Sequence, residues 1–441
     1  MFSHRVLRNI VTSTAKRNIS RRMATASRIQ LRSDQKPEYY RQGITSESTR
    51  TASELLQVNH ERHHIFFNTS GFHNHIVHQL LSMWALGASP EQLQREYDNN
   101  ASYQRPLKAP EASILHDLED PKKFTQYLGQ QVRYGDWLQY FRNEIDKTNW
   151  QDVLQKYVFA GDERAEQMLL RMFAGLLHPV IHLGFGIEFE QPAIIAEALA
   201  QAACHSNSIG DFLLSSERAA KEDNSHKSIV HLLEEIHSDQ TSNTPKPIQH
   251  YTSQVHVSES EIESKTAEMT NAVTYYTGAA QHPSHAIKFD FVFIHCVNSS
   301  IFFPPLLRLP FLTPAHKTRL LEWKIRLDLY FYASPKAPKL RHEDIANYQP
   351  KRPSGWEGVE RRVLGLSDDG HAVKLVRALA HGERVCRGYE AEGFRIGDGE
   401  WLQLGHMVVD SCEARGGDGS YWVRSAGLES AWEGVPVRAN L

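Results

Sequence analysis

Histidines at helical spacing inside apolar segments are the residues of this sequence best suited to chemistry. The chain contains 24 histidines, more than its 19 phenylalanines. His75 and His78 are three residues apart and His178 and His182 are four apart, so each pair shares one face of a helix. His295 stands alone in a third apolar segment. Two imidazoles on one helical face can bind one metal ion, so this pattern predicts a metal site.

A fourth segment carries His371, Lys374 and Arg377 at spacings of three, which aligns them on one helical face. Desolvation lowers the pKa of a lysine in an apolar helix, so its amine tends to be neutral. A neutral amine beside a metal ion can bind carbon dioxide and become a carbamate ligand. The alternative is an exposed lysine or an ion pair with Asp368, Asp369 or Glu188.

Each histidine pattern also has a simpler interpretation. A lone buried histidine such as His295 is more often a hydrogen-bonded core residue than a ligand, and His371 could cap its helix. The three histidines of a polar stretch are predicted to lie at the surface; they are His60, His63 and His64. The recurrence of histidine in apolar helices favours the metal site, because one ion satisfies several desolvated imidazoles together.

The elements that position these side chains are predicted to be helices. Apolar spacing predicts helices over residues 75–86, 136–147, 164–177, 192–204, 261–279, 290–303, 314–332, 370–381 and 401–412. Another helix begins after Ser89, which has Pro90 at the first helical position and Gln92 at the third. Few segments alternate as strands do. The fold class is therefore mainly α, as a single large helical domain with a histidine-lined metal site between its helices.

The predicted domain spans residues 45–441, with a polar insertion at about 215–260 that reads as a solvated or mobile loop. Residues 1–33 contain eight Lys and Arg, many Ser and Thr, and no acidic residue. This composition predicts a mitochondrial transit peptide. The alternative is a disordered tail on a cytoplasmic protein.

Composition excludes several classes of partner. The formal net charge is -3, and no basic stripe is interleaved with aromatic residues, so a nucleic acid partner is not expected. No stretch approaches the roughly 18 apolar residues of a membrane helix. The four cysteines form no C-x-x-C pair and are predicted to be small buried thiols.

Over about residues 65 to 415 the sequence resembles the questin oxidase-like family. The most specific match is HPVIHLGFGIE at 178–188; further matches are FHNHIVHQLL at 72–81, FIHCVNS at 293–299 and DGHAVKLVRAL at 369–379. The resemblance implies an oxidoreductase of fungal secondary metabolism. Its expected reaction is the Baeyer–Villiger-type oxidation or oxidative ring cleavage of an anthraquinone-type, polyketide-like aromatic substrate by dioxygen.

The resemblance also implies a non-haem iron held by histidines and, in part of the family, by a carboxylated lysine. Carried over to this chain, the ligands are His178, His182 and His295, then either His75 or His78, and Lys374. The predicted catalytic residues are His371, Arg377 and Glu188, the last by orienting a ligating histidine. No G-x-G-x-x-G follows a predicted strand, so NADPH is expected only as a transient reductant.

Two other functions remain open on sequence alone. A metal-dependent hydrolase with a carbamylated lysine would also use histidine ligands, but it is expected to need eight alternating strands and helices. A non-enzymatic helical scaffold would use its histidines for packing alone.

Overall fold

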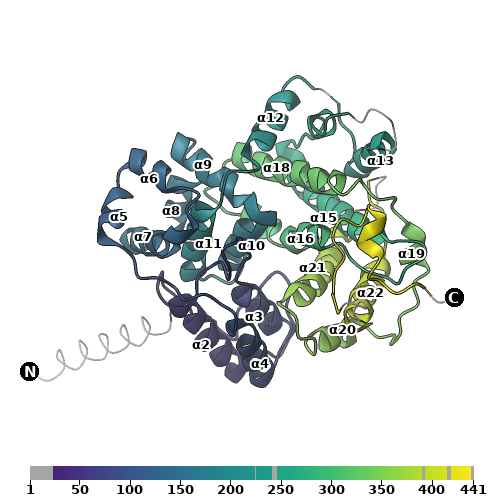
Figure 1. Cartoon of the computed structure of the whole chain (residues 1–441), viewed down its shortest axis with the longest axis horizontal. Helices are drawn as coiled ribbons and strands as arrows, with labels where there is room; N and C mark the ends of the chain where they lie inside the picture. The colour runs from purple at the N-terminus through teal and green to yellow at the C-terminus, as the bar shows by residue number, and fades with distance from the viewer. Residues whose placement is uncertain (1–22, 224, 241–245, 390–392, 415–418, 439–441) are drawn as a thin grey trace, which may run out of the picture.

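The computed structural model describes residues 23–223, 225–240, 246–389, 393–414 and 419–438, and its elements are helices (Figure 1). Among these residues, extended chain pairs only at isolated bridges, such as that between Phe66 and His73. The predicted mainly α class is confirmed. One contiguous hydrophobic core extends from Ala26 to Val435, so all parts of the described chain share it.

Four helices that pack on one another form the centre of the molecule. They are α3 (Ile76–Ala85), α10 (Ala174–Glu188), α16 (Phe291–Ser300) and α21 (His371–Cys386). Helices α10 and α21 both contact α3 and α16, so segments about 300 residues apart in sequence meet here. Figure 1 shows α10, α16 and α21 side by side near the middle of the view.

The other helices surround this centre. On the amino-terminal side of the chain they are α2 (Ser46–Arg62), α4 (Pro90–Ala101), α5 (Ala112–Asp117), α6 (Pro121–Tyr127), α7 (Tyr134–Lys147), α8 (Trp150–Tyr157), α9 (Glu163–Met172) and α11 (Pro192–Cys204). Later in the chain come α12 (Gly210–Ala220), α13 (Ile229–Gln240), α14 (Gln249–Thr252), α15 (Ile262–Ala279), α17 (Phe303–Leu307), α18 (Pro314–Ala333), α19 (His342–Ala346), α20 (Trp356–Val363) and α22 (Glu400–Ala414). Short 3-10 turns lie at Gln131–Arg133, Glu259–Glu261 and Glu429–Trp432.

Local sequence signals gave several helix ends correctly. The Ser89 side chain accepts from the Gln92 backbone N–H, and the Gln92 side chain accepts from the Ser89 backbone N–H, so the predicted capping box is present. Two other predicted helices were wrong at their ends. The helix expected over 164–177 ends at Met172, because the chain turns through the left-handed region at 175–177. The helix expected over 290–303 breaks after Ser300, because two prolines follow at 304 and 305.

The predicted polar loop at 215–260 was also wrong. Helices α12, α13 and α14 occupy about half of it, and α13 buries Ile229, Leu233 and Ile236. The apolar residues of α13 are spaced as on an amphipathic helix. The prediction of a loop followed the polar composition of the whole stretch and overlooked this spacing. Residues 224 and 241–245 lie outside the described part of the chain.

The fold begins near residue 23, not near residue 45 as predicted. Ile29 and Leu31 are buried, and the Leu31 backbone N–H donates to Ser53 Oγ on α2. The Gln30 backbone N–H donates to the side chain of Gln191, which lies before α11. Residues 23–33 of the predicted transit peptide are therefore part of the packed structure, and residues 1–22 lie outside the described chain.

No single helix among the described residues is long and apolar enough to cross a membrane. Helices α9 and α10 pass that test only as a pair, and they are bent by 95°.

Candidate metal centre

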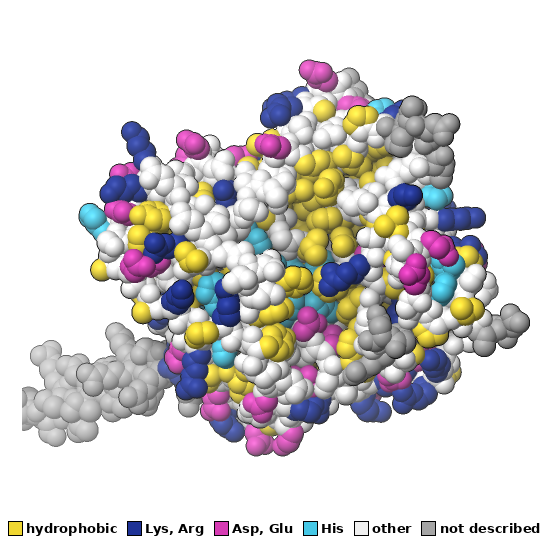
Figure 2. Space-filling model, in the orientation of Figure 1, with side chains coloured by type: hydrophobic (Ala, Val, Ile, Leu, Met, Phe, Trp, Pro, Cys, Tyr) yellow, Lys and Arg dark blue, Asp and Glu magenta, His cyan; other side chains and the backbone are white. Residues whose placement is uncertain are grey.

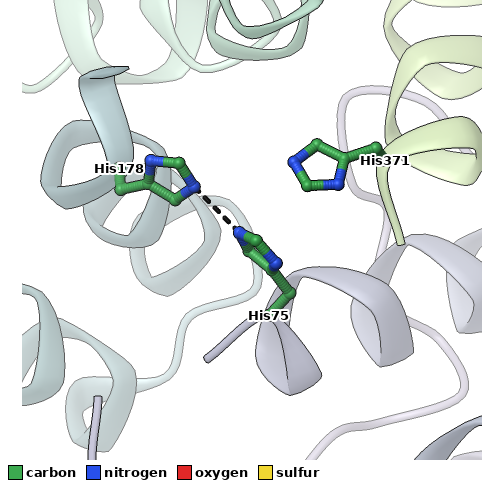
Figure 3. Close-up of side chains that lie close together, drawn as sticks. All are labelled: His75, His178 and His371. Carbon is green, nitrogen blue, oxygen red and sulfur yellow. Dashed lines mark hydrogen bonds between the residues drawn. The ribbon is translucent and has the colours of Figure 1, made fainter. Parts of the chain in front are cut away.

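Three buried histidines from separate helices converge at the centre of the molecule (Figure 3). They are His75 at the start of α3, His178 near the start of α10, and His371 at the start of α21. One nitrogen from each lies within 4.8 Å of the others, and the Nε2 atoms of His75 and His178 are 2.8 Å apart. The site therefore unites residues from three distant parts of the sequence.

His295 on α16 joins this group as a fourth imidazole. Its Nε2 atom lies 3.2 Å from Nε2 of His371, and its ring centroid lies 4.9 Å from that of His178. The sequence left open whether His295 was a core residue or a ligand. The structure places it at the edge of the three-histidine centre.

Backbone carbonyls fix two of the four rings. Nδ1 of His178 donates to the carbonyl oxygen of Gly175, and Nδ1 of His295 donates to that of Phe291, both at 2.6 Å. A carbonyl oxygen can only accept, so each ring carries its hydrogen on Nδ1 and presents a lone pair on Nε2. The Gly175 carbonyl is aimed by a turn in which residues 175–177 have φ of 55°, 55° and 66°.

One carboxylate, that of Asp369, faces the other two rings. Its Oδ1 lies 2.5 Å from Nδ1 of His371, and its Oδ2 lies 3.2 Å from Nδ1 of His75. Burial alone would raise the pKa of Asp369, but its contacts with His371 and His75 hold that pKa well below the usual range, so the carboxylate is ionised. Both rings then carry a hydrogen on Nδ1 and a lone pair on Nε2.

Gly370 allows α21 to approach α3 at this point. It precedes His371 with φ of +90°, which favours glycine, and a Cβ added there would lie 2.6 Å from Cβ of Gln79. Asp368 caps the helix by accepting from the Ala372 backbone N–H at 2.8 Å. His371 is thereby positioned by a tight turn and does not cap its own helix.

The electrostatics of the centre keep these rings neutral. Burial is the largest cause that lowers the pKa of His75, His178 and His295, and the charge of Lys374 adds to it. Burial also lowers the pKa of His371 to about 3 against the opposing charge of Asp369. Four neutral imidazoles with facing lone pairs are poorly satisfied by one another. They fit a transition-metal cation, for which imidazole is a preferred ligand.

His78 and His182 do not join the three-histidine centre. Nε2 of His78 lies 3.1 Å from Nδ1 of His182, whose Nε2 lies 2.8 Å from a carboxylate oxygen of Glu197. The other oxygen of Glu197 lies 2.6 Å from Nδ1 of His60. The predicted pairing of His178 with His182 on one ion is therefore replaced by a buried chain, His78–His182–Glu197–His60, beside the centre.

Three residues in or beside the centre were not predicted to be site residues from the sequence: His60, Glu197 and Asp369. His60 was predicted to lie at the surface, but it is buried because α2 packs against α11. There its ring contacts the carboxylate of Glu197. His64 is buried too, and His63 is half-buried. The available signals were Glu197, a lone carboxylate in the otherwise apolar stretch 192–200, and Asp369, two residues before His371.

Lys374 is buried, and no carboxylate in the described part of the chain forms an ion pair with it. Among the described residues no group hydrogen-bonds its Nζ, and burial lowers its pKa to about 8 against the charges of Asp369 and Asp368. The side-chain amide of Asn298 and Nδ1 of His78 also lack partners in the described part of the chain. Lys374, Asn298 and His78 each follow a histidine of the centre by three residues, one turn along α21, α16 and α3.

Arg377 and Glu188, both predicted to be catalytic, form a buried ion pair with one another. Arg377 Nε also donates to the backbone oxygen of Tyr39, and a Glu188 oxygen accepts from the Glu38 backbone N–H. These contacts hold the amino-terminal segment against α10 and α21. The histidine-orienting role predicted for Glu188 belongs instead to Asp369.

The centre lies below the surface. Figure 2 shows histidine side chains at the bottom of a hollow near the middle of that face, with acidic and basic side chains on its rim. Trp84, Phe185 and Phe189 are fully buried core residues, whereas Phe72 is 47% exposed. The four cysteines are buried and free, as predicted.

Comparison with known proteins gives one consistent result. The model of the family described as questin oxidase-like matches residues 72–379. A Baeyer–Villiger oxidase of Pestalotiopsis fici is 38% identical over 88% of this chain and 94% of its own length. A questin oxidase of Aspergillus fumigatus is 35% identical, over 94% of this chain and 100% of its own. The oxidoreductase AflY of Aspergillus parasiticus is 35% identical over 94% of each chain.

Proposed function

The chain belongs to the questin oxidase-like family of oxidoreductases, and we propose that it catalyses the oxygen-dependent Baeyer–Villiger-type oxidation, or oxidative ring cleavage, of an anthraquinone-type aromatic substrate. The observation that carries this proposal is the set of Nε2 lone pairs that face one another in the buried centre. The names of the relatives supply the class of reaction and the class of substrate.

The metal of this proposal is non-haem iron. His75, His178 and His371 would hold it, with His295 as a fourth nitrogen ligand at the edge of the centre. Lys374, buried and without a hydrogen-bond partner among the described residues, would add an oxygen ligand after it binds carbon dioxide. Bound iron(II) would supply the activation of dioxygen for this reaction.

The residues of the chain would orient the ligating rings, exclude water from the centre and transfer protons. Asp369 and the carbonyls of Gly175 and Phe291 fix the ring orientations, so little reorganisation is needed when a ligand arrives. Burial of the rings excludes water. The chain His78–His182–Glu197–His60 would carry a proton between the centre and α2, because each neighbouring pair is within hydrogen-bond distance.

The proposal includes two electron balances. Insertion of one oxygen atom into a carbon–carbon bond, with the other reduced to water, consumes two electrons and two protons. NADPH, bound transiently, is the proposed donor. Cleavage that places both oxygen atoms in the product consumes no external reductant. The ratio of NADPH oxidised to dioxygen consumed, one or zero, separates the two reactions.

Neither alternative function gains an observation in its favour. A hydrolase built as an eight-stranded barrel is not the fold of the described residues, which pair only at isolated bridges. A scaffold that uses its histidines for packing would place facing lone pairs in its core with nothing to satisfy them.

The test is metal analysis of the protein from residue 23 onward, loaded with iron(II) without oxygen. We expect about one iron per chain, and its loss in His75→Ala, His178→Ala and His371→Ala. His231→Ala changes an exposed histidine on α13 and serves as the matched control. A folded protein that takes up no metal would overturn the proposal in favour of a scaffold, and zinc-dependent hydrolysis would favour the hydrolase.

Mitochondrial localisation is a separate proposal, which confines the transit peptide to residues 1–22 because residues 23–33 are packed in the fold. A fluorescent protein fused after residue 22 is expected to enter mitochondria. Cytoplasmic fluorescence would contradict it.

A further inference from the structure

A pocket of about 320 Å³ opens on the surface beside the candidate metal centre. This volume is at the lower end of the range, roughly 300–1,000 Å³, typical of small-molecule sites. The side chains that matter for the argument are those of Phe291, Asp368, Asp369, Tyr421, Trp422 and Arg424.

The wall of the pocket contacts the histidines directly. The ring of Phe291 lies 5.0 Å from that of His371 and 4.7 Å from that of His295, measured between centroids. Trp422 lies 6.5 Å from His371. Asp369, whose side chain is 38% exposed, bonds to His371 on its inner side. A molecule in the pocket is therefore separated from the centre by single side chains.

Arg424 supplies a positive charge that the fold does not use. Its guanidinium lies 4.0 Å from the centroid of Phe291 and is exposed. Among the described residues no carboxylate lies within ion-pair distance of it, whereas most of the other described arginines, such as Arg362 and Arg377, form ion pairs. An arginine placed over an aromatic ring is restrained by that contact and can present its planar set of N–H groups to an anion.

The segment that carries Arg424 is fixed to the core. The Phe291 backbone N–H donates to the Val423 carbonyl at 2.8 Å, and the Val423 N–H donates to Phe289 at 3.0 Å. The Ala426 N–H donates to a carboxylate oxygen of Asp290 at 2.8 Å. The pocket is thus formed before a ligand binds, which reduces the entropic cost of binding.

We propose that this pocket binds a planar hydroxylated aromatic substrate as an anion, with Arg424 pairing with its ionised oxygen and Phe291 and Trp422 contacting its ring. The inference rests on the proposed function and adds the charge state and the specificity-determining residue. Asp368 and Asp369 lie toward the histidines, where backbone N–H groups and imidazoles engage them. In the proposed orientation, hydroxyl groups of the substrate donate to the carboxylates of Asp368 and Asp369, and its ionised oxygen faces Arg424.

The experiment compares two probes of nearly the same shape, one charged and one neutral: a dihydroxyanthraquinone carboxylate and its primary amide. Binding to the iron-loaded protein is measured by fluorescence without oxygen, so that no turnover occurs. We expect the carboxylate to bind more tightly than the amide. Arg424→Gln should weaken carboxylate binding about tenfold or more and leave amide binding unchanged. Arg424→Lys should restore part of the difference.

Arg361→Gln, an exposed arginine on α20 away from the pocket residues, is the matched control and should bind both probes as the parent does. Equal binding of the two probes by the parent, or equal losses for both in Arg424→Gln, would overturn the inference. Trp422→Ala should weaken both probes alike. Iron content is measured on each sample, so failure of the metal centre is detected separately from failure of the pocket.

Discussion

The Nε2 atoms of His75 and His178 face one another at 2.8 Å. The contacts of the two Nδ1 atoms disfavour a hydrogen bond between these Nε2 atoms. Nδ1 of His178 must keep its hydrogen to donate to Gly175. If His75 gave a hydrogen from Nε2 to His178, its bare Nδ1 would face the Asp369 carboxylate at 3.2 Å. With hydrogens on both Nδ1 atoms, the two Nε2 lone pairs face one another. With the hydrogen of His75 on Nε2, its Nδ1 lone pair faces a carboxylate oxygen instead. A cation between the rings removes that conflict.

Asp369→Asn is expected to weaken the metal site without unfolding the protein. The amide cannot accept from both Nδ1 atoms, so the rings of His371 and His75 lose their fixed orientation. Loss of such an outer partner typically lowers metal affinity about 10–100-fold. Competition with a chelator measures the change, and Asp211→Asn, an exposed substitution on α12, is the control. Unchanged affinity would contradict the role assigned to Asp369.

Glu197→Gln is expected to remove a pH-dependent part of the stability. Burial raises the pKa of Glu197, but hydrogen bonds from His182 and His60 lower it to about 2. The unfolded value is about 4.3, so the ionised carboxylate stabilises the fold above that pH and its contribution is lost as the pH falls toward 2.

The difference in unfolding free energy between the parent and Glu197→Gln should therefore shrink by roughly 3 kcal/mol across this window. Urea unfolding at several pH values measures it. Glu54→Gln, an exposed substitution on α2, should give a difference that does not change with pH. A constant difference for Glu197→Gln would show that the carboxylate is not held ionised in the fold.

Lys374 is expected to carry a carboxyl group in the metal-loaded protein. Its pKa is lowered to about 8, so the neutral amine that reacts with carbon dioxide becomes abundant as the pH rises through that value. Native mass spectrometry should show one added carbon dioxide per chain. Lys374→Ala should bind iron less tightly, and added formate or acetate should restore part of the affinity. Lys339→Ala, an exposed control, should bind iron as the parent does without either additive. No added mass and no rescue would leave Lys374 a plain buried amine.

Arg377→Met is expected to destabilise the protein rather than abolish its chemistry. The substitution leaves the buried Glu188 carboxylate without its cation, which typically costs roughly 3–5 kcal/mol. Denaturant unfolding measures the loss, and Arg361→Met is the exposed control. Iron content per folded chain should not change. A stable variant without activity would restore the catalytic role that the sequence suggested.

A chain that starts at residue 34 is expected to be less stable than one that starts at residue 23. The shorter chain loses Ile29 and Leu31, whose burial contributes roughly 1.5–3 kcal/mol each. The melting temperatures of the two chains and of the full chain should show the loss only in the shortest one. Equal stability of all three would mean that the packed segment 23–33 is dispensable.

The sequence by itself determined the helical class, about half of the helix positions and the histidines from which the centre is built. These depend on local signals: apolar spacing along α11 and α18, the cap at Ser89, and histidines inside apolar segments. Such signals act over a few residues and can be read without knowing the fold.

Only the tertiary structure decided which histidines meet. Spacing puts His178 and His182 on one helical face, yet His182 turns to Glu197 on α11, while His371 arrives from about 190 residues away. The same holds for Asp369 and His60, whose partners lie on other helices. Hydrogen-bond partners of buried groups are set by the packing of helices, and that packing is a long-range property that no local pattern records.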